Sequence, residues 1–156
     1  TVRVEYLQSY TKKITIEYLV RKMIKERIQQ KGEDLKMLQG HDRLAYLIDI
    51  AKDVEQLPDE VKTNENKIRG CASNLWLIGG IKEDNTMIYK IDADAFITKG
   101  TAKLVTDLCN GCPKDEVASL TIEDFLPLGV RELLTMQRQN GLGSLIERIV
   151  AIANTK

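Results

Sequence analysis

Two apolar runs joined by a short polar stretch decide the fold: LWLIGGIKEDNTMIYKI, residues 75–91. Residues 75–78 predict one strand, residues 79–85 a hairpin connection whose two glycines are typical of a turn, and residues 87–91 the antiparallel partner strand. Residues 67–69 could supply a short third strand. The stretch therefore predicts a small antiparallel β-meander.

Helical periodicity surrounds the hairpin on both sides. Gly32 is expected to end the first helix, Asp42 is a candidate N-cap for the second, and Thr121 with Asp124 has the spacing of a capping box. The predicted helices cover residues 14–30, 42–56, 96–109, 113–119 and 142–153. Because the strands are consecutive and helices lie before and after them, we expect an α+β fold with several helices on one face of the meander.

Composition narrows the class of protein. The chain has 156 residues, 43% of them hydrophobic, which fits one folded domain and argues against intrinsic disorder. No apolar run approaches the roughly 20 residues that cross a bilayer, so we expect no membrane association. A formal net charge of zero argues against a general nucleic-acid binder, and three cysteines are too few for a disulfide framework, which indicates a reducing compartment.

The zero net charge is unevenly distributed. Residues 1–31 hold eight basic and three acidic side chains, a charge of +5, whereas the rest hold 15 basic and 20 acidic side chains, a charge of −5. We therefore expect a basic, helical N-terminal extension over residues 1–32, followed by the main domain over residues 33–156. Our hypothesis is that the apolar stripe from Ile16 to Ile24 packs on the body or on a partner.

Few kinds of chemistry are open to this chain. A four-ligand zinc site would need all three cysteines and the lone His41, and no glycine-rich nucleotide-binding motif is present. Cys109 and Cys112 form a C-x-x-C pair, but the pair closes a predicted helix, where the helix dipole raises the thiol pKa. A structural role is the simpler interpretation, and a dithiol redox protein remains an alternative.

Cys71 lies in a different setting, between a polar loop and the first strand. Gly70 permits unusual backbone angles beside it, and Arg69 and Lys67 could stabilise a thiolate. Spacing alone fits a buried structural cysteine equally well.

Three motifs resemble the SufE family of sulfur acceptors for cysteine desulfurases, in the right order and spacing over about residues 35–153. The family has a basic stretch followed by G-C-x-S-x-V-W, then D-S-D-A-x-I-x-[KR]-G, then S-R-x-N-G-L. The matching stretches here are residues 66–76 (NKIRGCASNLW), 92–100 (DADAFITKG) and 138–142 (RQNGL). The helix of residues 43–49 fits as well.

The resemblance implies a fold shared with IscU-type scaffolds and a function. It implies that Cys71 takes persulfide sulfur from a pyridoxal-phosphate desulfurase, stimulates that enzyme and passes the sulfur to a scaffold for iron–sulfur cluster assembly. Arg138 is the candidate cation for the thiolate or the docked complex. The remaining candidate residues have supporting or partner-binding roles: Arg69, Gly70, Ser73 as a local packing and capping residue, Asp94 as a helix cap, and Asn140 with Gly141 at a helix start.

The same resemblance sets the remaining expectations. The chain would be a sulfurtransferase-like accessory protein and desulfurase activator that is monomeric and holds no cofactor or metal, since the pyridoxal phosphate belongs to the desulfurase. A bacterial cytoplasm and a plastid-type organelle both fit. The alternatives are a metal-binding iron–sulfur scaffold and a dithiol redox protein that uses Cys109 and Cys112.

Overall fold

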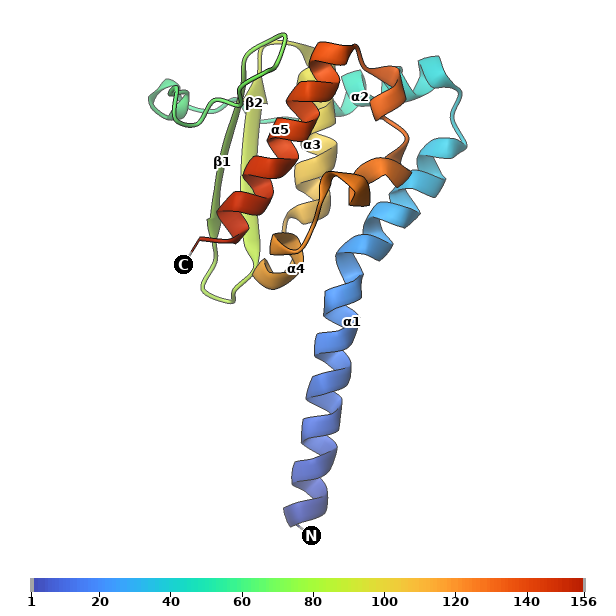
Figure 1. Cartoon of the computed structure of the whole chain (residues 1–156), viewed down its shortest axis with the longest axis vertical. Coiled ribbons are helices and arrows are strands. Elements are labelled where there is room, and N and C mark those ends of the chain that lie inside the picture. The colour runs from blue at the N-terminus through green and yellow to red at the C-terminus, as the bar shows by residue number, and fades with distance from the viewer. Residues whose placement is uncertain (1, 156) are drawn as a thin grey trace.

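The computed structural model describes the backbone of residues 2–155 and the side chains of residues 3–9, 11 and 23–155. Helices precede and follow a single hairpin along this part of the chain (Figure 1). The elements in order are α1 (Val2–Lys36), α2 (Gly40–Ala51), η1 (Asp59–Val61), β1 (Leu75–Ile81), β2 (Met87–Ala93), α3 (Phe96–Cys109), α4 (Lys114–Ala118), η2 (Ile122–Leu128), η3 (Arg131–Leu133) and α5 (Met136–Ala153), where η marks a 3-10 helix.

The hairpin and the helices that cover it confirm the α+β prediction. β1 and β2 pair antiparallel, with Leu75 opposite Ala93 and Ile81 opposite Met87. Alternate residues of both strands are buried, because α3 packs on β2 and α5 packs on β1 from the same side (Figure 1). One part of the core therefore lies between the hairpin and these two helices.

The expected third strand is reduced to a single bridge. In the part of the chain that the structure describes, the sheet has two strands, and Lys67 forms an isolated bridge with Trp76. Two backbone hydrogen bonds flank the bridge, Ile68 N–H to Leu75 O at 2.8 Å and Leu77 N–H to Asn66 O at 2.8 Å. This pairing holds the chain beside β1 just before it turns toward Cys71.

The prediction that Gly79 and Gly80 form the hairpin turn is wrong, because both lie inside β1. The turn follows them, where Lys82 N–H donates to Thr86 O at 2.8 Å. Gly79 has a packing reason instead: a Cβ there would lie 2.6 Å from Cδ1 of Tyr89, the residue opposite it. The glycine leaves room for the aromatic ring.

The prediction that Gly32 ends the first helix is also wrong. α1 continues to Lys36, and a Cβ at Gly32 would lie 2.2 Å from the carbonyl oxygen of Pro127, so the glycine allows α1 and η2 to approach closely. α2 begins earlier than expected, with Gln39 rather than Asp42 at the N-cap.

The later helices follow the predictions more closely. α3 has the expected bounds, and the capping box of Thr121 and Asp124 is present at the start of η2. α5 begins at Met136, six residues before the predicted start at residue 142.

The first half of α1 extends away from the body, whereas its second half is part of the core (Figure 1). Ile24, Ile28 and Leu35 are buried against the body. Within the predicted apolar stripe, Met23 is exposed, and the positions before it lie outside the described side chains. The division into an extension over residues 1–32 and a main domain over residues 33–156 stays a prediction. One continuous helix crosses residue 32, and core packing begins before it, at Ile24.

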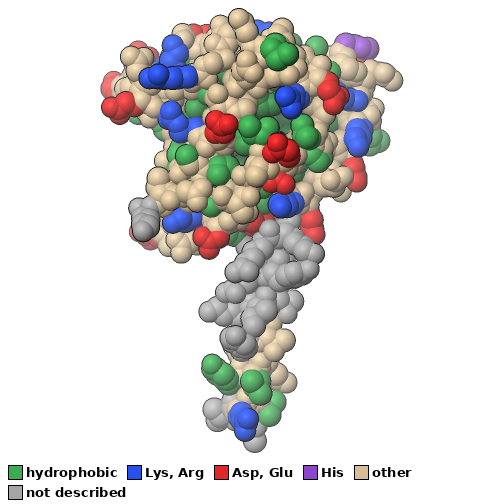
Figure 2. Space-filling model, viewed as in Figure 1, with side chains coloured by type: hydrophobic (Ala, Val, Ile, Leu, Met, Phe, Trp, Pro, Cys, Tyr) green, Lys and Arg blue, Asp and Glu red, His purple; other side chains and the backbone are tan. Residues whose placement is uncertain are grey.

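The surface carries both signs of charge. Figure 2 shows Lys and Arg side chains interspersed with Asp and Glu over the visible face of the body. No helix in the described part of the chain is long and apolar enough to span a membrane.

Candidate functional site

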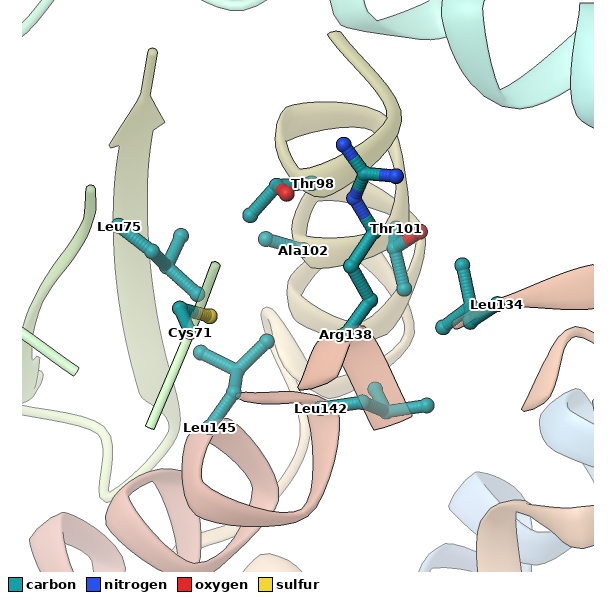
Figure 3. Close-up of a pocket in the computed structure, with 9 residues that line it drawn as sticks. All are labelled: Cys71, Leu75, Thr98, Thr101, Ala102, Leu134, Arg138, Leu142 and Leu145. Carbon is teal, nitrogen blue, oxygen red and sulfur yellow. The ribbon is translucent and has the colours of Figure 1, made fainter. Parts of the chain in front are cut away.

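Cys71 lies on the loop that leads into β1, and its side chain lines a small cavity between α3 and α5. The cavity volume is about 10 Å³, the room that one water molecule needs. Figure 3 shows the Cys71 sulfur directed toward the space between the two helices. The other lining residues are Leu75 of β1, Thr98, Thr101 and Ala102 of α3, Leu134, and Arg138, Leu142 and Leu145 of α5.

Gly141 allows α5 to contact the thiol. A Cβ at this position would lie 2.1 Å from Cys71 Sγ and 3.3 Å from its Cα, and the first of these distances is closer than atoms can approach. Gly141 is buried in the second turn of α5 and Asn140 is exposed, so these residues do not form the helix start that we expected. The structure places Gly141 directly behind Cys71 and leaves Asn140 on the surface.

Two opposing effects act on the Cys71 thiol. Burial raises its pKa, because the apolar walls disfavour the thiolate, and the positive charge of Arg138 partly offsets this rise. The Arg138 side chain extends from α5 beside α3 (Figure 3), and its Nε is buried without a hydrogen-bond partner in the structure. Arg138 is therefore the cation that the fold brings to the thiol.

Arg69 does not share this position. Its side chain is exposed and lines a separate surface hollow with Ser144, Glu147 and Arg148. Although Arg69 is near Cys71 in sequence, the charge that lowers the pKa of the thiol comes from Arg138, 67 positions further along the chain.

Hydrogen bonds to the start of α3 hold the residues that follow Cys71. The hydroxyls of Ser73 and Thr98 are 2.9 Å apart, and Asn74 Nδ2 donates to Asp94 Oδ2 at 2.6 Å. The prediction that Asp94 caps the helix is wrong, because Ala95 is the N-cap of α3 and no side chain caps it. The Asp94 carboxylate instead tethers the Cys71 loop.

Gly70, the residue before Cys71, has no side chain that could tether the loop. Gly70 has a φ of +83°, a left-handed conformation that favours glycine, and its side is open enough that a Cβ would lie 3.7 Å from Ser144 Oγ. The loop thus has an unusual backbone turn on one side of Cys71 and side-chain tethers on the other.

Sequence reasoning missed one charged residue near the site, Asp92. The residue is 2% exposed, and its carboxylate accepts hydrogen bonds from Lys62, Lys99 and the backbone. A signal was present, because an acidic residue lies near the end of the second strand and Lys99 follows in the same motif. Its partner Lys62 lies on a loop whose position cannot be predicted from hydrophobic periodicity.

Cys109 and Cys112 lie in the core rather than at the cavity. Both are fully buried, and burial raises the pKa of Cys109 to about 12. Burial also raises the pKa of Cys112, although Arg27 Nη1 donates to its Sγ at 3.1 Å. Burial and a raised pKa both disfavour the reactive thiolate form, which argues against the dithiol redox alternative. The described residues contain no group of three or more His, Cys, Asp or Glu side chains arranged to hold a metal ion.

The fold and the site define a class of small α+β proteins with a single half-buried thiol in a cavity that an arginine also lines, and comparison with known proteins identifies the family. A model of the SufE domain, described as an Fe-S metabolism associated domain, matches residues 29–153. The chain belongs to the SufE family.

Several relatives are similar over most of the chain. An uncharacterized SufE-like protein of Rhizobium etli is 39% identical over 112 residues, which cover 69% of this chain and 76% of the relative. The sulfur acceptor protein CsdE of Escherichia coli is 30% identical over 116 residues, 74% of this chain and 79% of the relative. The solution structure of a hypothetical protein from Thermus thermophilus has a TM-score of 0.68 and 19% identity, and the match covers 81% of this chain and 93% of that one, which shows the same fold.

Proposed function

We propose that this protein accepts sulfur on Cys71 from the persulfide of a cysteine desulfurase, stimulates that enzyme and passes the sulfur on for iron–sulfur cluster assembly. The observation that carries the proposal is the thiol of Cys71 in a small lined cavity beside Arg138. Family membership supports it, and so does the similarity to a relative named as a sulfur acceptor.

The transfer is a thiol–disulfide exchange. The Cys71 thiol loses its proton, and the resulting thiolate attacks the outer sulfur of the partner's persulfide. The new S–S bond forms on Cys71 while the old bond breaks, and the partner cysteine leaves as a thiolate that takes up a proton. No external oxidant or reductant is needed, because one S–S bond replaces another.

The surroundings of Cys71 fit both halves of this exchange. A cation near the sulfur favours the attacking thiolate and the persulfide anion, and Arg138 supplies that charge. The cavity of about 10 Å³ has room for one additional atom of about the size of a water molecule, such as the outer sulfur of a persulfide. A persulfide in this position is partly shielded from reductants in solution, because Cys71 is half-buried.

Transfer from a second protein requires Cys71 to leave the cavity. Gly70, with its φ of +83°, is suited to a hinge on one side, and the Ser73–Thr98 and Asn74–Asp94 hydrogen bonds must break or shift on the other. We propose that docking of the desulfurase exchanges these contacts for contacts with the enzyme.

The test is to mix the protein with a desulfurase, cysteine and pyridoxal phosphate and to measure intact mass and desulfurase turnover. The wild-type protein is expected to gain one sulfur atom and to raise turnover, and Cys71→Ser to lose both effects. Cys109→Ser and Cys112→Ser are the matched controls and should retain both. If a control loses sulfur uptake while Cys71→Ser retains it, the assignment to Cys71 is wrong.

A further inference from the structure

The Asp92 carboxylate forms a buried charged centre that the proposed transfer does not use. Lys62 Nζ lies 3.0 Å from Asp92 Oδ2, and Lys99 Nζ lies 3.3 Å from Oδ1. The backbone N–H of Leu57 donates to Oδ2 at 3.0 Å, and that of Ala93 donates to Oδ1 at 2.8 Å. Both carboxylate oxygens thus have one cationic and one neutral donor.

The two lysines come from opposite sides of the Cys71 loop. Lys62 follows η1 in the chain that leads toward Cys71, whereas Lys99 belongs to the first turn of α3, on which the loop rests. Lys62 also lies over the Trp76 ring, 5.3 Å from its centroid, and Trp76 is opposite Asp92 in the hairpin. Asp92 therefore joins two segments that are separate in sequence and that both border the loop.

On the side of Lys99, the link to Cys71 is short. The hydroxyl of Thr98, the residue before Lys99, is 2.9 Å from the Ser73 hydroxyl. Thr98 also lines the cavity, together with Thr101 and Ala102 of the next turn. An ion pair that fixes the first turn of α3 consequently fixes one wall of the cavity.

On the side of Lys62, the link follows the backbone. Asn66 Nδ2 donates to Val61 O at 2.8 Å, and Asn66 O accepts from Leu77 N–H in β1 at 2.8 Å. The chain that enters the loop is thereby joined to β1 on one side and to Asp92, through Lys62, on the other.

We propose that Asp92 is a positioning residue for sulfur transfer. By binding both Lys62 and Lys99, it fixes the two segments that flank the Cys71 loop. Only the loop itself then moves when Cys71 leaves the cavity. The proposal rests on the sulfur-acceptor function proposed above. Loss of either lysine removes a cation from a buried carboxylate, which weakens the attachment of the flanking segment that carries this lysine.

The decisive measurement is the rate at which iodoacetamide alkylates each cysteine of the folded protein, resolved by peptide mass spectrometry. Lys99→Met is expected to raise the rate at Cys71 by at least about threefold, because local opening of the loop becomes more frequent. Cys109 and Cys112 serve as internal references, since both are fully buried in the core. Their rates should stay unchanged.

Lys103→Met is the matched control. Lys103 lies one turn after Lys99 on α3 and pairs with Asp107 at 2.9 Å, but the Asp107 side chain is 54% exposed. Its loss should leave the rate at Cys71 unchanged. Lys62→Met should have the same effect as Lys99→Met, because it releases the segment on the other side of the loop. The test therefore does not depend on the folding of one variant.

Two outcomes would overturn the proposal. Equal Cys71 rates in the Lys99→Met and Lys103→Met proteins would show that the ion pair does not hold the loop. A parallel rise at all three cysteines would show that Asp92 contributes only to global stability. The alkylation measurement requires no desulfurase, so the positioning role is tested even if wild-type Cys71 accepts no sulfur.

Sulfur uptake as a function of desulfurase concentration adds a second readout. When a flanking segment is displaced, Cys71 is poorly oriented toward the persulfide of the docked desulfurase. Lys99→Met should therefore lower the maximal rate of uptake by about threefold and leave the half-saturating concentration unchanged. Unchanged maximal rates in both the Lys62→Met and Lys99→Met proteins would contradict the positioning role.

Discussion

Cys71 and Gly141 lie in direct contact, so that a Cβ at Gly141 would be 2.1 Å from the Cys71 sulfur. Position 141 therefore determines whether the thiol can remain in its cavity. The two residues are 70 positions apart, and the contact exists only because α5 crosses behind the loop.

Gly141→Ala should expel Cys71 from the cavity. The added methyl group collides with Sγ, so we expect a loss of about 1 to 3 kcal/mol in the free energy of unfolding, measured with urea, and faster alkylation of Cys71. Gly143→Ala is the control in the same helix, because a Cβ there would lie 3.6 Å from Ile122 Cδ1, an ordinary contact. That change should stabilise the helix by roughly 0.5 to 1 kcal/mol. Similar effects of the two substitutions would refute the steric role of Gly141.

Arg138→Gln should raise the pKa of the Cys71 thiol further. Burial already raises this pKa, and the substitution removes the positive charge that opposes the rise. The midpoint of the pH profile for alkylation of Cys71 should therefore move to higher pH. Arg69→Gln, which changes an exposed arginine near Cys71 in sequence, should leave the midpoint in place. A shift caused by Arg69→Gln alone would reassign the relevant cation.

Asp92 should make the stability of the protein depend on pH in acid. Burial alone would raise the pKa of its carboxyl, but the Leu57 and Ala93 N–H groups and the two lysines together lower it. A carboxyl whose pKa is lower in the folded state stabilises the protein above its unfolded pKa of about 3.9 and loses that contribution as pH falls through the folded value.

Urea unfolding of the wild type and of Asp92→Asn at a series of pH values checks this dependence. The difference in the free energy of unfolding should be largest above the usual Asp range and should shrink as the pH falls below it. Asp107→Asn, at an exposed ion pair, should change stability by less than about 1 kcal/mol at any pH. A difference for Asp92→Asn that is independent of pH would contradict the prediction.

Gly100→Ala should be strongly destabilising, because a Cβ at Gly100 would lie 1.8 Å from the carbonyl oxygen of Leu47, a backbone atom of α2 that cannot move alone. We expect a loss of about 3 kcal/mol in urea unfolding. Gly80→Ala is the control, since a Cβ there meets nothing within 4 Å. Equal stabilities of the two variants would mean that α2 and α3 can separate without cost.

The fold class could be predicted because it depends on local periodicity. The strands of the hairpin and the bounds of α3 follow from the alternation of apolar residues and from the helix-ending turn at Asn110 and Gly111. The roles of three glycines could not be predicted in this way. Gly32, Gly79 and Gly141 each leave room for an atom from another element, Pro127 O, the Tyr89 ring and Cys71 Sγ, and local propensity interprets such glycines as turns or helix ends.

The candidate site shows the same division. Cys71 could be singled out from its motif, and the family resemblance indicated Arg138 as the cation. Local sequence alone offered Arg69 and Lys67 instead, because the place of Arg138 depends on how α5 crosses the loop. Asp92 was missed for a related reason. A buried carboxylate is stable only with its donors, and one of them, Lys62, lies on a loop whose position follows from tertiary packing alone.

The burial of Cys109 and Cys112 has a practical consequence. To a thiol-directed fluorophore or spin label, the native protein presents one reactive position, so Cys71 can be labelled without removal of the other two cysteines. Because the cavity has room for only about one water-sized atom, the label would lie outside it, and its mobility and solvent contact would report where a partner covers the loop.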